Sequence, residues 1–144
     1  MRSDAIEKAF PGLTAGGYKI SSPQNYRYNC IAWATNNDTK WWWPDPQNIG
    51  YWPSGVPRKV TLESFISAFE SLGFSVCDNQ DLEEGYEKIA IFTDLRDIPT
   101  HAARQLPSGR WTSKLGRLED IEHELMGVAG SAYGKISVVL RRPT

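Results

Sequence analysis

The stretch THAARQLPSGRWTSKLG, residues 100–116, decides how this chain folds. Two segments, 100–106 and 110–116, flank a Pro-Ser-Gly triplet at 107–109. A three-residue connection that ends in glycine is typical of a β-hairpin, because glycine readily adopts the positive φ that such a turn requires. The stretch therefore predicts two antiparallel strands joined by a tight turn.

The register of this hairpin decides which side chains share a face. If Leu106 pairs with Arg110, the alternation of side chains along each strand places Ser113 on the same face as His101. Slippage by one residue would replace Ser113 by one of its neighbours, Thr112 or Lys114.

The rest of the chain predicts an α+β fold. Further strands are expected at residues 16–21, 74–77, 87–94 and 133–142. Helices are expected, from capping residues and apolar periodicity, at residues 4–10, 30–35, 62–72 and 118–126. Asn29 and Thr61 are the expected N-caps of the second and third helix, and Asp4 with Glu7 resembles a capping box for the first. Because helices come first and a mostly antiparallel sheet follows, we predict a single α+β domain over residues 1–144.

Composition limits the kinds of partner. The chain has 144 residues and a formal net charge of −1, which gives no reason to expect a nucleic acid partner. No apolar run approaches the roughly 20 residues that span a bilayer, and the N-terminal segment has no apolar leader, so we expect no membrane partner. The protein is expected in the cytoplasm as encoded, unless a separate apparatus secretes it. A basic cluster around the hairpin is expected to form a solvated or salt-bridged face: Arg104, Arg110, Lys114 and Arg117.

Cys30 is the strongest candidate for a nucleophile. It follows Asn29 at the start of an expected short helix, and a helix N-terminus lowers the pKa of a thiol. The alternative is that Cys30 is a core residue, since free cysteine is among the most buried residue types. Cys77, at the end of an apolar strand, is expected to be a core or edge residue.

His101 is the preferred partner of Cys30. It begins a strand that can hold an imidazole rigidly, whereas His123 falls on the exposed side of an expected helix. A catalytic imidazole needs a third group to orient it, and the hairpin register favours Ser113. A backbone carbonyl is the alternative for that role.

Gln24, six residues before Cys30, is positioned to donate to an oxyanion beside the sulfur. In this chain order, Gln24, Cys30 and His101 resemble the glutamine, cysteine and histidine of papain-like cysteine hydrolases, and the compact arrangement resembles the NlpC/P60 type. The chain is also similar to an uncharacterised group of small bacterial proteins that contain YNCIAWA, a WWWP loop, and HAARQL followed by WTSKLG. The resemblance implies a papain-like fold and hydrolysis of an amide or peptide bond without a cofactor or metal. By analogy of fold, it also implies a toxin or effector role.

Residues 38–60 form an expected long ordered loop that is rich in proline and tryptophan. The structural interpretation is that this loop folds over the core and seals it. The functional interpretation is that its aromatic rings form a wall of the substrate cleft. The residues predicted to bind substrate are Trp41, Trp42, Trp43, Trp52 and Tyr28.

The leading prediction is thus a cysteine peptidase or amidase that acts on a peptide or protein. In it Cys30 attacks the carbonyl, His101 transfers the proton, Ser113 orients the ring, and Gln24 stabilises the oxyanion. The alternative is an inactive module of the same fold, such as an immunity or assembly protein, that binds a protein partner through its Trp-rich loop.

Overall fold

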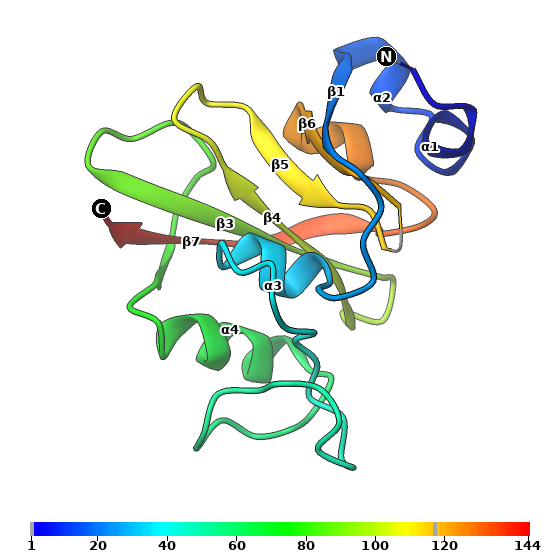
Figure 1. The fold of residues 1–144 in the computed structure, drawn as a ribbon. Helices are drawn as coiled ribbons and strands as arrows, with labels where there is room; N and C mark the ends of the chain where they lie inside the picture. The colour runs from blue at the N-terminus through cyan, green and yellow to red at the C-terminus, as the bar shows by residue number, and fades with distance from the viewer. Residues whose placement is uncertain (1, 117) are drawn as a thin grey trace.

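The computed structural model describes residues 2–116 and 118–144, and its centre is one antiparallel sheet (Figure 1). In the described part of the chain the sheet has seven strands in the order β1-β6-β5-β4-β3-β7-β2. The strands are β1 (Tyr18–Ser22), β2 (Ser75–Cys77), β3 (Tyr86–Thr93), β4 (Pro99–Gln105), β5 (Trp111–Lys114), β6 (Asp120–His123) and β7 (Lys135–Pro143). The predicted α+β class is confirmed.

Helices cover both faces of the sheet. They are α1 (Asp4–Ala9), α2 (Leu13–Gly16), α3 (Cys30–Ala34), α4 (Leu62–Glu70) and the 3-10 helix η1 (Leu125–Val128). Apolar side chains of α3 and α4 pack on one face, and those of α1, α2 and η1 pack on the other. Central strand β3 sends Ile89 and Ile91 to the first face and Ala90 and Phe92 to the second. A strand buried on both faces is a nearly continuous apolar run, as the sequence of β3 is.

The hairpin has the predicted register. The backbone N–H of Leu106 donates to the carbonyl of Arg110 at 2.7 Å, and Gln105 is the Cα partner of Trp111. Gly109 has φ of 92°, a value that glycine adopts without the steric cost of a Cβ atom. His101 and Ser113 consequently lie on the same face of the sheet.

Two predicted helix caps are present. The Asn29 side chain accepts from the backbone N–H of Ala32, and the Thr61 side chain accepts from that of Ser64. Asn29 also binds the backbone of Trp42 on both sides, by accepting from its N–H at 3.1 Å and donating to its carbonyl at 2.6 Å. This one side chain therefore fixes the start of α3 and anchors the Trp-rich loop to it.

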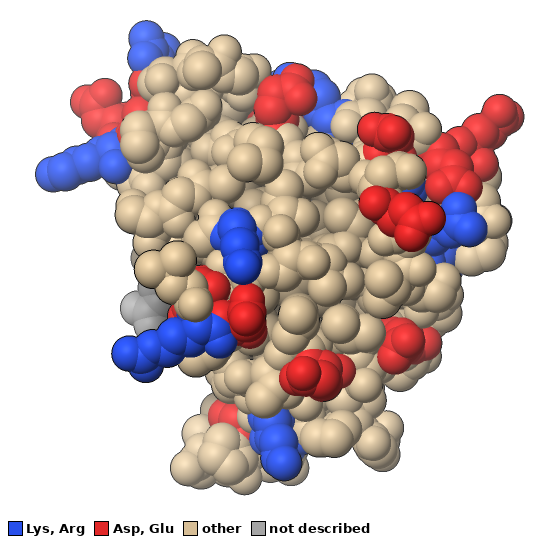
Figure 2. Space-filling view, turned by 180° about the vertical axis from the view of Figure 1, so that it is seen from behind, with Lys and Arg blue, Asp and Glu red and all other residues tan. Residues whose placement is uncertain are grey.

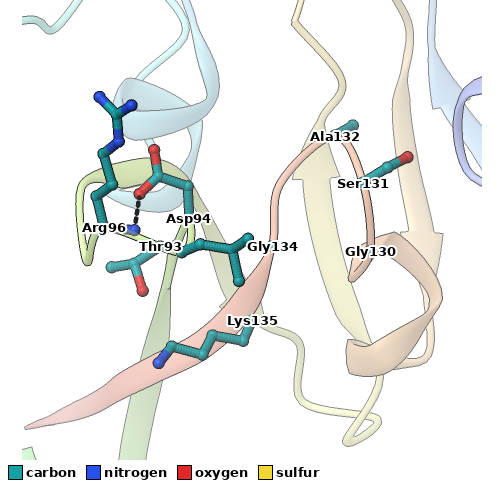
Figure 3. A pocket seen from close by; sticks show the side chains of 9 residues that line it. Thr93, Asp94, Arg96, Gly130, Ser131, Ala132, Gly134 and Lys135 are labelled. Carbon is teal, nitrogen blue, oxygen red and sulfur yellow. Dashed lines mark hydrogen bonds between the residues drawn. The ribbon is translucent and has the colours of Figure 1, made fainter.

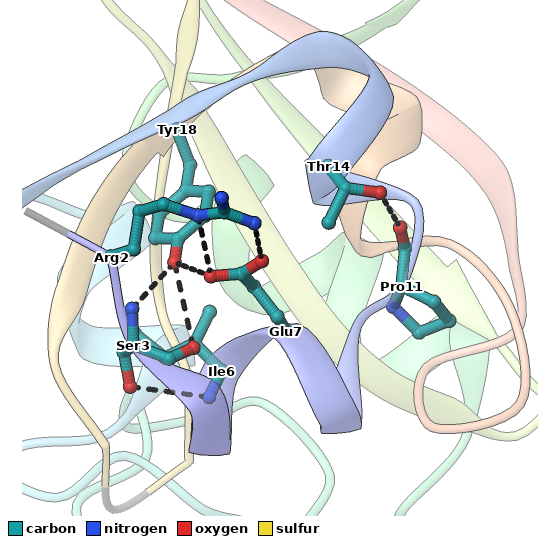
Figure 4. Close-up of polar contacts among 7 residues, drawn as sticks. All are labelled: Arg2, Ser3, Ile6, Glu7, Pro11, Thr14 and Tyr18. Carbon is teal, nitrogen blue, oxygen red and sulfur yellow. Dashed lines mark hydrogen bonds and ion pairs between the residues drawn. The ribbon is translucent and has the colours of Figure 1, made fainter.

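The first helix is capped one residue earlier than predicted (Figure 4). The hydroxyl of Ser3, instead of the carboxylate of Asp4, accepts from the backbone N–H of Ile6. The Glu7 carboxylate accepts from the guanidinium of Arg2 and from the hydroxyl of Tyr18, and this hydroxyl accepts from the backbone N–H of Ser3 (Figure 4). These contacts tie α1 to β1.

The helix predicted at residues 118–126 is wrong. This segment forms β6, which pairs with β5 on one side and β1 on the other, followed by η1. The spacing of Leu118, Ile121 and Leu125 fits a helix, but a strand between two neighbours has its backbone N–H and C=O groups satisfied on both sides. Strand pairing, which depends on distant segments, overrides the local periodicity.

Charged side chains are dispersed on the face seen from behind the sheet (Figure 2). Basic groups are scattered over this face, and acidic groups are closest together at its upper right, where a basic group lies beside them. Each helix in the described ranges is too short or too polar to cross a bilayer.

Candidate active site

Three polar side chains form a hydrogen-bonded chain across three adjacent strands. Nε2 of His101 on β4 lies 2.9 Å from Oγ of Ser113 on β5, and the same Oγ lies 2.7 Å from Nε2 of His123 on β6. Nδ1 of His123 lies 2.6 Å from the backbone carbonyl of Glu124. His101, Ser113 and His123 are all fully buried.

The direction of each hydrogen bond follows from the carbonyl at its end. Because a carbonyl only accepts, Nδ1 of His123 carries the proton and, in the neutral ring, Nε2 accepts from the Ser113 hydroxyl. The Ser113 oxygen then accepts from the Nε2–H of His101. Burial lowers the pKa of His101 well below its usual value, and the charge of His123 lowers it further, so His101 is neutral near pH 7.

Nδ1 of His101 is consequently an unprotonated nitrogen with a free lone pair. This atom is buried and has no hydrogen-bond partner among residues 2–116 and 118–144. Buried polar atoms without partners are rare in native proteins, and each calls for a structural or functional reason. The chain of hydrogen bonds through Ser113 holds the ring in the tautomer that exposes this nitrogen.

Tyr133 covers the imidazole of His101. The two rings are stacked with centroids 3.9 Å apart and an interplanar angle of 3°. The backbone N–H of Gly116 lies near the Tyr133 hydroxyl, and the Tyr133 carbonyl accepts from the hydroxyl of Thr100. The tyrosine is thus held at both ends while it shields the ring from solvent.

Cys30 is the first residue of α3, as predicted, and its side chain packs within the core on the α3 face of the sheet. The residue is 8% exposed, and the backbone N–H of Ala102 lies near enough to the sulfur to favour the thiolate. Burial raises the pKa of the Cys30 thiol to about 11, although backbone N–H groups and the Lys114 charge favour the thiolate. In the free protein Cys30 is a neutral thiol.

Cys30 and His101 are neighbours but are not hydrogen-bonded. The sulfur contacts the N–H of Ala102, the residue after His101, yet the His101 side chain packs with Phe92 on the opposite face of β4. Within the described residues, the ladder between β4 and β5 covers Gln105 and Arg104 only, so the sulfur lies where these strands separate. The expected direct contact between thiol and imidazole is absent in this conformation.

A second polar cluster lies under α3, on β5, β6 and the segment before α3. The hydroxyls of Ser22 and Tyr28 both donate to Oδ2 of Asp120, while Oδ1 of Asp120 is buried and finds no partner within the described part of the chain. Lys114, the Cα partner of Asp120, is fully buried, with Nζ 2.6 Å from the carbonyl of Leu118 and 5.4 Å from the centroid of the Tyr28 ring.

The prediction that Lys114 lies on a basic, solvated face is wrong, because the residue is fully buried. Arg110 does form the predicted kind of surface ion pair, with Glu124 at 3.0 Å. Arg104 is partly buried, and its guanidinium lies over the ring of Trp33. Arg117 lies outside the described residues.

Gln24 does not reach the sulfur. Its amide is exposed and donates to the carboxylate of Glu119 at 3.4 Å. The loop after Pro23 carries it to the surface, where an amide is well solvated. The predicted oxyanion role of Gln24 is not supported by its position.

The Trp-rich loop seals the core on the α4 side. Trp42 and Trp52 are buried, and Trp43 meets the ring of Phe65 edge-on. Tyr28, also predicted to bind substrate, is buried and stacks with Trp33. Trp41 keeps 39% of its surface exposed and is the loop tryptophan best placed to contact a partner. The structural interpretation of the loop fits this packing.

A pocket of about 550 Å³ lies beside the loop that carries Tyr133 (Figure 3). It opens between the turn that holds Asp94 and Arg96 and the loop that holds Ser131 and Ala132. Gly130 and Gly134 close this loop through two backbone hydrogen bonds, of 2.9 and 2.7 Å. Among residues 2–116 and 118–144, no three His, Cys, Asp or Glu side chains are grouped to hold a metal ion.

Sequence reasoning missed four residues of these clusters: His123, Tyr133, Lys114 and Asp120. His123 and Asp120 fell in the segment mistaken for a helix. Their alternation with Ile121 in DIEH was the available signal for a strand. No local pattern brings Tyr133 to His101, because that contact joins residues 32 positions apart.

Comparison with known proteins identifies the family of the chain. No curated protein and no solved structure matches the chain. The model of a family described as a domain of unknown function (DUF7689) matches residues 19–141, which include every strand from β2 to β6, most of β1 and β7, and both polar clusters. The chain belongs to this family.

Proposed function

We propose that this chain is a cysteine hydrolase with a papain-like fold of the NlpC/P60 type, which cleaves an amide or peptide bond in a peptide or protein. The observation that carries the proposal is the free lone pair on Nδ1 of His101. One ring nitrogen is fixed by Ser113 and the other is unprotonated, which is the form of imidazole that a general base requires. The Cys30 sulfur lies against the next residue of the same strand.

The proposed reaction begins when Nδ1 of His101 takes the thiol proton of Cys30 and the sulfur attacks the substrate carbonyl carbon. The imidazolium then gives this proton to the leaving amine, and a thioester to Cys30 remains. Water, deprotonated by His101, hydrolyses the thioester and restores the thiol. Ser113 and His123 keep the ring in one tautomer during both steps.

Proton transfer requires the sulfur and Nδ1 to approach to about 3 Å. The free protein does not make this contact, and catalytic hydrogen bonds are often long before substrate binds. The separation of β4 and β5 beside Ala102 leaves no ladder hydrogen bonds to break there. Because the sulfur and the imidazole lie on opposite faces of β4, the proposed step that brings them together is a rearrangement of β4 at His101 and Ala102 when substrate binds, and a shift of α3 alone is not sufficient.

The test is the formation of a thioester on Cys30. Dipeptide amides of a fluorescent amine are incubated with the protein, and intact-mass spectrometry follows acylated protein while fluorescence follows amine release. We expect Cys30→Ala to abolish both signals and Cys77→Ala, the matched control, to retain them. Full activity in Cys30→Ala would show that the nucleophile is another group. A thiol reaction also fits a reducing compartment such as the cytoplasm.

A second candidate is an inactive interaction module on the same fold. It is favoured by the raised pKa of the Cys30 thiol, about 11, and by its 8% exposure. The exposed part of Trp41 is then the expected contact with a protein partner. This candidate predicts that no amide acylates Cys30. It also predicts that Trp41→Ala, unlike Cys30→Ala, abolishes binding of the protein partner.

A further inference from the structure

Lys114 is a buried cation without an ion-pair partner in the described structure. The residue is fully buried on β5, and its Nζ donates to the carbonyl of Leu118. No carboxylate of the described residues lies within 4.0 Å of this Nζ, the limit for an ion pair. A buried charge is costly unless it is paired or hydrogen-bonded, and this ammonium has one hydrogen bond and the Tyr28 ring but no ion pair among the described residues, so it is available to an anion that forms during function.

The nearest acid does not meet this need. Asp120 is the Cα partner of Lys114 across β5 and β6, but its Oδ2 is bound by Ser22 and Tyr28. Glu119 is engaged at the surface by Gln24. Each of these acids interacts with Lys114 only at a distance beyond an ion pair.

Cys30 lies on the same side of the sheet as Lys114. Helix α3 packs across β4 and β5, and Tyr28, two residues before Cys30, places its ring 5.4 Å from Nζ of Lys114. The charges of Cys30 and Lys114 interact: Lys114 favours the thiolate, and the thiolate favours the ammonium. Of the other titratable groups near the sulfur, Tyr133 is neutral, since burial raises the pKa of its hydroxyl, and His101 approaches β4 from the opposite face.

We infer that Lys114 is the buried cation that stabilises the thiolate of Cys30 when its proton moves to His101. The inference rests on the proposed function and deepens it. The S–H bond breaks, the proton goes to Nδ1 of His101, and the electron pair stays on sulfur, while Lys114 keeps its three protons. The thiolate then lies on the same face of the sheet as the Lys114 ammonium, while the imidazolium belongs to the opposite face of β4. Lys114 thus provides charge stabilisation of the kind predicted for Gln24, at the sulfur instead of the oxyanion.

The test is the pH profile of Cys30 alkylation in a Cys77→Ala background. Iodoacetamide reacts with the thiolate, so its rate reports the thiolate fraction without any need for hydrolysis. We expect Lys114→Met to lower the rate at about pH 8 by roughly three- to tenfold, which corresponds to about 0.5–1 unit in the thiol pKa. Lys114→Arg, which keeps the charge, should retain most of the rate. Thermal unfolding checks that both variants are folded.

The pH dependence separates a charge effect from a packing effect. Burial lowers the pKa of Lys114, so the advantage of the wild type over Lys114→Met should shrink as pH rises and Lys114 loses its proton. In Lys114→Arg the advantage should persist, because arginine stays charged. Equal rates in wild type and Lys114→Met, or a ratio that does not change with pH, would overturn the inference.

The wild-type profile decides the question if Lys114→Met does not fold. In a plot of the logarithm of the wild-type alkylation rate against pH, the slope should decrease in the pH range where Lys114 deprotonates. A slope that stays constant through that range would overturn the inference. The outcome is also distinct from that of the proposed function. If Lys114→Met shifts the pH profile of alkylation but no amide acylates Cys30, the interaction of Lys114 with the Cys30 thiolate is supported and the hydrolase proposal is rejected.

Discussion

Nε2 of His101 on β4 and Oγ of Ser113 on β5 are hydrogen-bonded at 2.9 Å inside the sheet. The serine oxygen accepts here because its own hydrogen is committed to His123. The Glu124 carbonyl fixes the tautomer of His123, and the Ser113 hydroxyl in turn fixes that of His101. Removing this hydroxyl should therefore lower the stability of the fold as well as any activity.

Ser113→Ala should lower the free energy of unfolding by about 1–3 kcal/mol, because the Nε2–H of His101 would be buried without an acceptor. Urea denaturation measures this change. Ser131→Ala is the matched control, since Ser131 is exposed, and it should be nearly neutral. Equal effects of the two substitutions would show that the buried hydrogen bond contributes nothing net.

The buried histidines should make the fold less stable in mild acid. Burial lowers the pKa of His123 to about 4, whereas an unfolded histidine titrates near its ordinary value of about 6.5. Between these values the unfolded chain binds the proton and the folded chain does not. His123 therefore contributes a stability that is complete above about pH 6.5 and falls by roughly 1.4 kcal/mol per pH unit as the pH drops toward 4.

The comparison of wild type with His123→Gln isolates the pH-dependent contribution of His123 to the free energy of unfolding. Denaturation at a series of pH values between about 4 and 7 should give a steeper loss of stability for the wild type, because glutamine does not titrate. His101, whose pKa burial also lowers, remains in both proteins. Parallel curves would mean that His123 is not buried in its neutral form.

Tyr133 should control the titration of His101. Tyr133→Ala removes the stacked ring and admits water, so the pKa of His101 should rise toward its ordinary value, while Tyr133→Phe keeps the ring and should leave it low. Histidine ring signals in NMR spectra, followed through a pH titration, measure this pKa. An unchanged His101 titration in Tyr133→Ala would contradict the shielding role.

Asn29 should contribute more to stability than an ordinary helix cap. Asn29→Ala removes the cap of α3 and both hydrogen bonds to the backbone of Trp42, whereas Thr61→Ala removes only the cap of α4. A cap is typically worth about 1 kcal/mol, and a buried backbone group left unpaired costs about 1–3 kcal/mol more. Chemical denaturation should rank Asn29→Ala clearly below Thr61→Ala, and Trp fluorescence should report the loosened loop.

Local sequence determined the elements whose signals are complete within a few residues. The Pro-Ser-Gly turn fixed the hairpin register, and with it the contact of His101 with Ser113, because side chains alternate from the turn outward. Asn29 and Thr61 marked the starts of α3 and α4, since each cap bonds a backbone N–H three residues ahead. The apolar run of β3 indicated a strand covered on both faces.

Only the tertiary structure decided what these elements meet. Residues 118–126 carry a spacing that suits a helix, and the unpaired edges of β1 and β5 made a strand of Asp120–His123 instead. Because Asp120–His123 is a strand, His123 is buried and hydrogen-bonds Ser113, which in turn bonds His101. The same pairing sets Asp120 opposite Lys114 under α3. Lys114, expected on the surface, is buried on the same face of the sheet as Cys30. Gln24, expected beside Cys30, lies on the surface with Glu119. A side chain's burial and charge partners depend on segments about 100 residues away, and no local pattern encodes that distance.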